Sequence, residues 1–165
     1  MTERKTLLQR ELKQRRPFES PGHEALLGLF RTADAAGRVV AAAIEPHGIT
    51  GQQFNVLRIL RGAQPDPLPT LEIGERMIEQ TPGITRLLDR LEAKGLVARN
   101  RCATDRRQVH CRITPAGLKL LDVLDGPVRD AGNAVMRPIG VAGQKQLVAL
   151  LDRVRAALET GQHLR

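Results

Sequence analysis

The sequence of 165 residues lacks several features that mark common protein classes. It contains no tryptophan, no tyrosine and three phenylalanines. Proteins that read RNA or single strands stack bases on aromatic side chains, so this composition disfavours them. The two cysteines, Cys102 and Cys111, lie in one short stretch without further metal-ligand partners. We therefore expect reduced thiols rather than a disulfide framework.

Long apolar runs are also missing. The longest candidate, Val39 to Ile44, falls far short of the roughly 20 residues that a membrane-spanning helix needs. The first 16 residues interleave Arg and Lys with Glu and Gln, and they contain no apolar core of a signal peptide. We expect a cytoplasmic protein with no membrane partner.

No arrangement of residues indicates catalysis. The four histidines, His23, His47, His110 and His163, lie far apart and lack metal-ligand spacing. No Gly-rich phosphate loop follows a predicted strand, and no nucleophile, base and acid match a known motif. We expect no metal, no cofactor and no enzymatic activity.

Basic charge is in excess and unevenly distributed. The chain has 26 Lys and Arg against 18 Asp and Glu, a net charge of +8. Residues 81–112 alone hold eight basic and three acidic side chains, and residues 1–16 hold six and two. Such an excess indicates a polyanionic partner. Because aromatic stacking platforms are missing, we favour double-stranded DNA.

Capping signals predict several helices in the first half of the chain. Ser20-Pro21 starts a long amphipathic helix that runs to Pro46, since a capping hydroxyl precedes a proline at the first helical position. Thr50 and Gln53 fit a capping box at the start of a central helix, which ends at Gly62. An irregular loop is expected over 64–69, where three prolines occur.

Two short helices follow in the pattern. The first is capped by Thr70 and extends to about Glu79, with Leu71, Ile73 and Met77 as its apolar contacts. The second starts at Thr81-Pro82 and is closed by Gly95. Its apolar stripe predicts burial of Ile84, Leu87, Leu88 and Leu91, and the opposite face carries Gly83, Thr85, Arg86, Asp89 and Arg90.

From Leu96 to Ile113 the apolar period changes to two, which predicts a β-hairpin with a basic tip at 102–106. Within it, Cys111 is expected to point into the core. Thr114-Pro115 starts another helix, with a kink or break at Gly126-Pro127. A final helix is expected from about Ala142. The fold class is therefore mainly α with a small β-hairpin wing.

A helix-turn-helix followed by a two-stranded ribbon is a winged helix. A helix with small, hydroxylated and basic residues in its first turns can enter the major groove, where Arg pairs with guanine and Thr contacts thymine methyl groups. An Arg at the hairpin tip suits the narrow minor groove. Taken alone, Arg86 and Arg90 read as a solvated helix face, and Arg107 as an exposed hairpin arginine. Their shared context favours contact with DNA.

Three stretches in order resemble the MarR family of bacterial transcriptional regulators. They are residues 81–97, the Asp105-Arg106-Arg107 wing signature, and Ile113-Thr114-Pro115-Ala116-Gly117. Two further stretches, His47-Gly48-Ile49-Thr50 and Phe54-Asn55-Val56-Leu57, are similar to the family's second-helix start. The resemblance implies a homodimeric repressor that binds a pseudo-palindromic operator and is released by a small aromatic or phenolic effector.

The resemblance also implies a division of the chain. Residues 1–19 would form a basic N-terminal arm, residues 20–46 and 114–165 a helical dimerisation region, and residues 47–113 the winged helix-turn-helix lobe. The residues expected to contact DNA are Thr81, Pro82, Gly83, Thr85, Arg86, Arg90, Arg99, Arg101, Asp105, Arg106 and Arg107. Among them Arg107 would enter the minor groove and Asp105 would orient basic wing side chains, while Arg99, Arg101 and Arg106 would contact phosphates.

Other interpretations stay open at this point. In the cleft where family members bind effectors, the candidates are Phe30, Arg38, His47 and Phe54. For each of them a packing or surface role is at least as good an interpretation as effector binding. The basic surface could instead grip an acidic protein partner. Cys102, near basic residues that lower a thiol pKa, could act in a redox-sensing regulator, although an incidental thiol is favoured.

Overall fold

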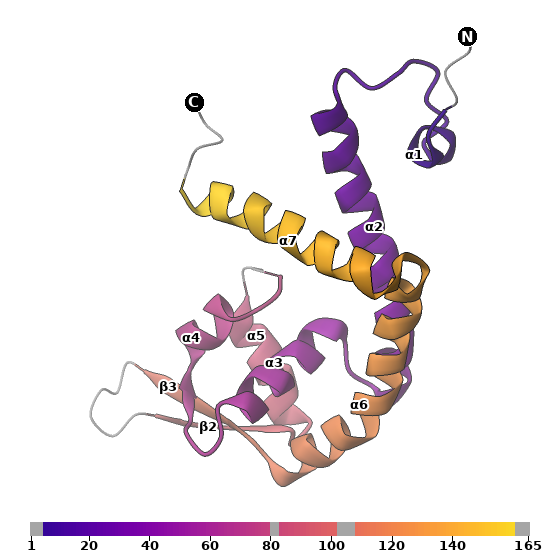
Figure 1. Cartoon of the computed structure of the whole chain (residues 1–165). Coiled ribbons are helices and arrows are strands. Elements are labelled where there is room, and N and C mark those ends of the chain that lie inside the picture. The colour runs from indigo at the N-terminus through magenta and orange to yellow at the C-terminus, as the bar shows by residue number, and fades with distance from the viewer. Residues whose placement is uncertain (1–4, 80–82, 102–107, 161–165) are drawn as a thin grey trace. The chain divides into compact units, whose positions relative to one another are not determined.

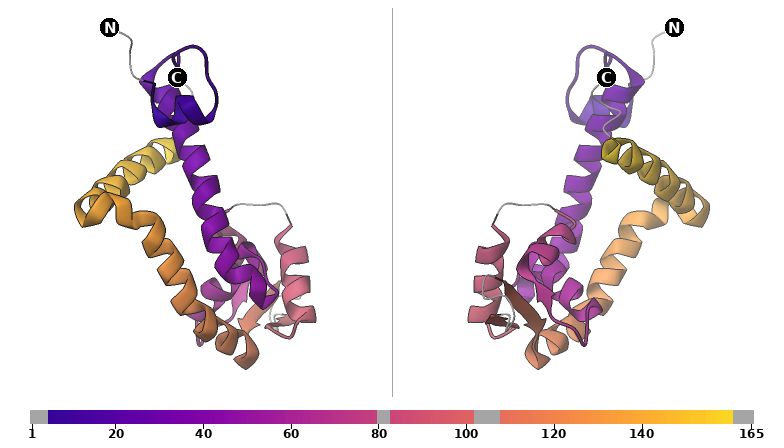
Figure 2. Two further views of the ribbon diagram at one scale, coloured as in Figure 1. Left: turned by 90° about the vertical axis from the view of Figure 1, so that its right-hand side faces the viewer. Right: turned by 90° about the vertical axis from the view of Figure 1, so that its left-hand side faces the viewer.

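The computed structural model describes residues 5–79, 83–101 and 108–160. The chain divides into two compact units, residues 1–39 and residues 40–165. Helix α2, Pro21–Ile44, begins in the first unit and ends in the second. Figure 1 labels the α-helices and strands β2 and β3, and Figure 2 shows helix α6 leading from the sheet to helix α7.

The described part of the N-terminal arm, residues 5–19, contains a short helix. Helix α1, Leu7–Glu11, starts with a capping box between Thr6 and Gln9. It contacts α2 through an ion pair between Glu11 and Arg31, 3.6 Å apart. Helix α2 begins where the sequence predicts, because the Ser20 hydroxyl accepts the backbone N–H of His23 at 3.1 Å.

The core of the second unit forms around helix α3, Gly51–Gly62. The capping box of Thr50 and Gln53 is confirmed, and the helix ends at Gly62 as predicted. Val56 and Leu57 are fully buried in this helix. The end of α2 joins the same core through Ile44, and a 3₁₀ turn, η1 (Glu45–His47), leads from α2 to α3.

The segment before helix α4 is a strand, not the irregular loop that its prolines suggest. Strand β1, Leu68–Pro69, pairs with β3 and gives a three-stranded antiparallel sheet in the order β1-β3-β2. The loop prediction is wrong over these two residues because β3 offers a free edge to them. Leu68 is consequently buried opposite Cys111.

Helix α4, Thr70–Glu75, is shorter than predicted and Thr70 does not cap it. The Thr70 hydroxyl donates instead to the Val109 carbonyl at 3.2 Å, because the pairing of β1 with β3 brings that acceptor within reach. Ile73 and Met77 are buried as expected. Leu71 is not, since 74% of it is exposed to solvent.

Helix α5, Ile84–Ala93, leads into the hairpin of β2, Val97–Arg101, and β3, Val109–Ile113. The register pairs Val97 with Ile113 and Arg99 with Cys111, so the hairpin prediction is confirmed. Cys111 is fully buried, and this burial raises the pKa of its thiol. It is therefore a core residue, as predicted, rather than a reactive one.

Helix α6, Pro115–Met136, continues through Pro127, so the break expected there is absent. Its predicted start is confirmed, with the Thr114 hydroxyl accepting the Gly117 N–H at 3.1 Å. Arg61 on α3 donates to both Asp125 oxygens at 2.7 and 2.9 Å, which joins α6 to the core. The same hydrogen bonds hold the pKa of Asp125 below its ordinary value.

The C-terminal helix follows a 3₁₀ turn. This turn is η2, Arg137–Ile139, and helix α7 spans Gly140–Glu159, close to the predicted start. Helix α7 has no buried residue, and several of its large apolar side chains face solvent. Within the described part of the chain, no helix is both long and apolar enough to cross a membrane.

Candidate nucleic-acid interface

Helix α5 separates a buried apolar side from an exposed polar side. Leu88 and Leu91 are fully buried against the core. The residues predicted on the opposite face are all exposed, namely Gly83, Thr85, Arg86, Asp89 and Arg90. Among the described residues, neither Arg86 nor Arg90 takes part in an ion pair. Both guanidinium groups are thus available to an external anion.

The start of α5 differs from the prediction. The helix begins at Ile84, and its N-cap is Gly83, whose φ of 114° is a conformation that favours glycine. Because this cap has no side chain, the first N–H groups of α5 receive no side-chain acceptor from it. Thr81 and Pro82, predicted to start the helix and contact DNA, lie outside the described residues.

The corner between α4 and α5 is anchored to α3 by amide side chains that the sequence patterns did not single out. The Asn55 Oδ1 atom accepts the backbone N–H of Ile78 at 2.9 Å. One turn earlier, Gln52 Nε2 donates to Glu79 at 2.9 Å. Their sequence signal is a pair of amides, three residues apart, on a helix that is otherwise apolar on most sides. These hydrogen bonds hold Ile78 and Glu79, which follow α4, against α3.

A hollow of about 490 Å³ lies beside the first turns of α5, between α3, α4 and α5. Its lining includes Gln52 of α3, Met77 after α4, and the exposed Arg86 and Arg90 of α5. This hollow therefore lies beside the polar face of α5, and the guanidinium groups of Arg86 and Arg90 line it.

The hairpin contributes arginines of two different kinds. Arg101, at the end of β2, is exposed and has no ion pair within the described ranges. The Arg99 side chain is only 21% exposed and is paired with Asp89 and Glu92 of α5. The hydrogen bond to Glu92 raises the pKa of Arg99 above its ordinary value. Arg99 is thus engaged within the protein, and the phosphate contact that the resemblance implies for it stays a prediction.

Part of the predicted interface lies outside the described residues. This part is the stretch 102–107, which holds Asp105, Arg106 and Arg107 of the wing signature and the nearby Cys102. Their roles therefore stay predictions. The strands on both sides of this stretch, β2 and β3, are paired over their full described length.

The junction between β3 and α6 explains the third motif of the resemblance. The Thr114 hydroxyl donates to the Gly95 carbonyl at 2.7 Å, so it links the strand-to-helix corner to the end of α5. A Cβ atom at Gly117 would lie 2.5 Å from the Leu96 carbonyl oxygen and 2.7 Å from Ile113 Cγ1. Only glycine allows α6 to approach the hairpin this closely.

The four effector candidates occupy different environments. Phe30 and Arg38 lie on α2 in the first unit, where Phe30 is 61% exposed and Arg38 pairs with Asp34. His47 is exposed in η1. Phe54 is 7% exposed and packs in the core of the second unit, as the packing alternative predicts.

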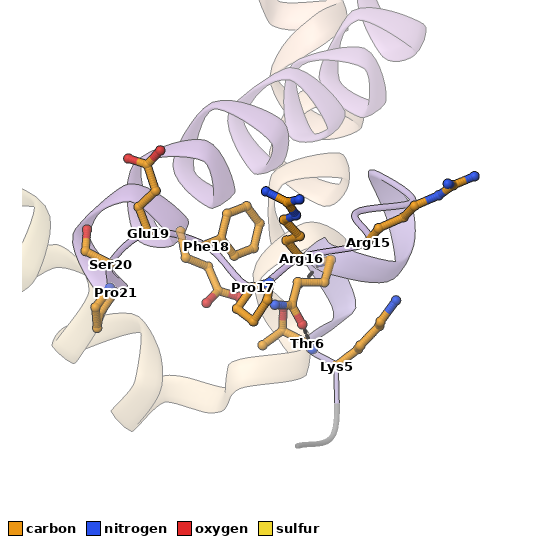
Figure 3. A pocket seen from close by; sticks show the side chains of 11 residues that line it. Lys5, Thr6, Arg15, Arg16, Pro17, Phe18, Glu19, Ser20 and Pro21 are labelled. Carbon is orange, nitrogen blue, oxygen red and sulfur yellow. Dashed lines mark hydrogen bonds between the residues drawn. The ribbon is translucent and has the colours of Figure 1, made fainter. Parts of the chain in front are cut away.

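The first unit has a hollow of its own, of about 490 Å³. Figure 3 shows Lys5 and Arg15 extending to one side of it and Glu19 to the other. Its lining carries three cationic side chains and two carboxylates, so it has no strong charge of one sign. The lining residues are Lys5, Thr6, Gln9, Arg15, Arg16, Pro17, Phe18, Glu19, Ser20, Pro21 and Glu24.

Known proteins match this arrangement over most of the chain. The sequence model of the MarR family matches residues 47–108, which hold α3, α4, α5 and β2. The crystal structure of a MarR transcription factor from Planctomyces limnophilus is 37% identical and has a TM-score of 0.64. That likeness covers 82% of this chain and 98% of the other. The chain belongs to the MarR family of transcriptional regulators.

Two further relatives extend the comparison for this MarR protein. The HTH-type transcriptional regulator FarR of Neisseria gonorrhoeae is 26% identical over 147 residues, which are 87% of this chain and 99% of FarR. A crystal structure of the Staphylococcus aureus MepR–DNA complex is 24% identical, with a TM-score of 0.71, and the likeness covers 78% of this chain and 95% of MepR. MepR shares the fold.

Proposed function

We propose that this MarR protein is a cytoplasmic, homodimeric repressor that binds double-stranded DNA at a near-palindromic operator and is released by a small aromatic or phenolic effector. One observation supports the proposal most strongly: α5 turns Thr85, Arg86 and Arg90 to solvent while Leu88 and Leu91 anchor it. The fold it shares with MepR, solved in a complex with DNA, supports the same reading.

The mechanism follows from the chemistry of the exposed face. With α5 in the major groove, the fork of Arg86 or Arg90 bonds guanine O6 and N7, and the Thr85 methyl group contacts a thymine methyl. The hairpin then reaches the neighbouring minor groove, where Arg107 would insert, and Arg101 and Arg106 would neutralise phosphates. Each part reads or grips a different element of the duplex.

The basic composition makes a salt titration the test of this proposal. We expect affinity for a random-sequence duplex to fall steeply with salt, with a logarithmic slope of about −0.9 for each phosphate contacted. Equilibrium titrations by fluorescence anisotropy at four salt concentrations measure that slope. A slope near zero contradicts the proposal. Tight binding to an acidic polypeptide, without any sequence preference, would favour a protein partner instead.

The dimer proposal rests on apolar surface that a single chain leaves uncovered. On α7, Leu150 and Val154 are 56% and 50% exposed, and on α2 Phe30 is 61% exposed. Exposed apolar side chains one helical turn apart, such as Leu150 and Val154, form the kind of patch that marks an interface. This apolar surface would be covered if the terminal helices packed against those of a second copy. The division of the chain into arm, dimerisation region and lobe is part of the same proposal.

We expect the double variant Leu150→Asp with Val154→Asp to be monomeric. Both side chains face solvent in the single chain, so the substitutions should leave helix content unchanged while placing four carboxylates in the dimer interface. Sedimentation velocity gives the mass and circular dichroism the helix content. The matched control replaces two exposed polar residues of α7, Arg153→Asp and Gln146→Asp, and should retain the dimer. A dimeric Leu150/Val154 variant would contradict the assignment of this face.

A further inference from the structure

Arg99 connects the wing hairpin to α5, the helix whose polar face is exposed to solvent. Arg99 lies in the middle of β2, and its side chain reaches back to α5. Its Nη1 atom lies 2.7 Å from Asp89 Oδ1, and its Nε atom donates to Glu92 Oε2 at 2.8 Å. A single planar guanidinium group therefore holds two carboxylates one turn apart on α5.

The burial of the three side chains shows which partner is fixed. Arg99 is 21% exposed, while Asp89 and Glu92 are 51% and 41% exposed. The arginine thus lies beneath its acidic partners, with its donors turned toward them. Arg101, two residues along the same strand, is exposed and makes no ion pair in the part of the chain that the structure describes. Neighbouring arginines of one strand consequently have different roles.

The position of Asp89 gives this cluster a consequence for an anionic partner. Asp89 shares the exposed face of α5 with Arg86 and Arg90. A free carboxylate there would repel phosphates, because like charges a few ångströms apart interact unfavourably even near a protein surface. The Arg99 guanidinium neutralises this carboxylate and at the same time restrains α5 relative to β2.

We propose that Arg99 is a positioning residue: it locks α5 onto the wing strand and holds Asp89 and Glu92 against the protein, and it does not itself contact DNA. This inference rests on the proposed function, because it concerns how the same surface is set for a duplex. It replaces the phosphate contact that the sequence suggests for Arg99.

A double-mutant cycle on Arg99 and Glu92 tests the proposal. The probe is a duplex enriched by the wild-type protein from a random pool, with a random-sequence duplex beside it. If electrostatic repulsion alone mattered, removing a carboxylate near DNA would tighten binding. We expect the opposite for Glu92→Gln, which should weaken binding by about threefold or more because the substitution releases α5 from Arg99. Arg99→Gln should weaken selected-duplex binding about tenfold, and the double variant should be no weaker than Arg99→Gln, as expected for residues that act through one shared interaction.

Salt dependence and selectivity separate positioning from direct contact. Arg99→Gln should keep the salt slope and lower the ratio of selected-duplex to random-duplex affinity. The matched variant Arg101→Gln should reduce the slope by about 0.9 for each phosphate that it no longer neutralises, and it should weaken both duplexes alike. The proposal is overturned if Glu92→Gln binds as well as or better than wild type, or if Arg99→Gln behaves like Arg101→Gln. Failure of the wild-type protein to select any duplex would instead overturn the proposed function.

Discussion

Gly117→Ala is expected to lower the free energy of unfolding by about 3 kcal/mol, at the upper end of the usual cost of overpacking. The added Cβ would meet the Leu96 carbonyl oxygen at 2.5 Å and Ile113 Cγ1 at 2.7 Å. A backbone oxygen cannot rotate away as a flexible side chain can. Helix α6 would therefore have to move off the hairpin, which also strains the Thr114 hydrogen bond to Gly95.

Helix α6 supplies the matched control for this substitution. Apart from its chain neighbours and the nearby backbone of its own helix, nothing lies within 4 Å of a Cβ built at Gly126, so Gly126→Ala adds a methyl group without a clash. It should raise the free energy of unfolding by about 0.5–1 kcal/mol, because alanine loses less backbone entropy than glycine in a helix. Urea denaturation followed by circular dichroism measures both variants. Equal stability of Gly117→Ala and wild type would show that the close approach of α6 is not required.

The double variant Arg86→Ala with Arg90→Ala is expected to bind its selected duplex about 100-fold more weakly than wild type, or worse. A bidentate arginine–guanine pair contributes about 1–3 kcal/mol of discrimination, and in a symmetric dimer each substitution removes two such arginines. Neither side chain has an ion pair among the described residues, so their removal should leave the melting temperature nearly unchanged. Anisotropy titration and thermal denaturation give the two readouts.

Total charge is controlled by removing two basic residues elsewhere. Lys119 and Arg129 are exposed on α6, and their joint change to alanine lowers the net charge equally. Arg129 Nε lies 3.7 Å from Asp130 Oδ1, so its loss also removes one exposed ion pair. This variant should bind the selected duplex within about threefold of wild type, because long-range charge outside the contact surface is largely screened at physiological salt. Full binding of the selected duplex by the Arg86/Arg90 variant would contradict the role of α5 in reading DNA. Function that survives the double replacement, together with binding that shows no sequence preference, would favour an acidic protein partner for the basic surface.

Local chemistry made most of the helix starts predictable. The caps at Ser20, Thr50 and Thr114 need only a hydroxyl at the right offset from the following N–H groups, and each is made as expected. The apolar stripe of α5 was equally legible, since Leu88 and Leu91 recur at the helical period. These features depend on residues within one turn of each other, which a sequence displays directly.

The differences arose where residues far apart in sequence meet. From the sequence, Thr70 is predicted to cap a helix. In the structure its hydroxyl donates to the carbonyl of Val109, which lies 39 positions later in the sequence and is brought close by β3. Leu68 is predicted to lie in a loop, but in the structure it pairs with Cys111 of β3. Arg99 reads as a free cation because its sequence position does not show that the hairpin folds it back onto Asp89 and Glu92. Charge and proline content cannot foretell such pairings.

Selection of bound sequences from a random duplex pool tests the central claim most directly. A symmetric pair of α5 helices should enrich a near-palindrome whose half-site centres lie about 34 Å apart, one turn of B-DNA. The wild-type protein should yield such a motif, and the Arg86→Ala with Arg90→Ala variant should lose it. A pool that stays random after repeated rounds with the wild-type protein would contradict the account.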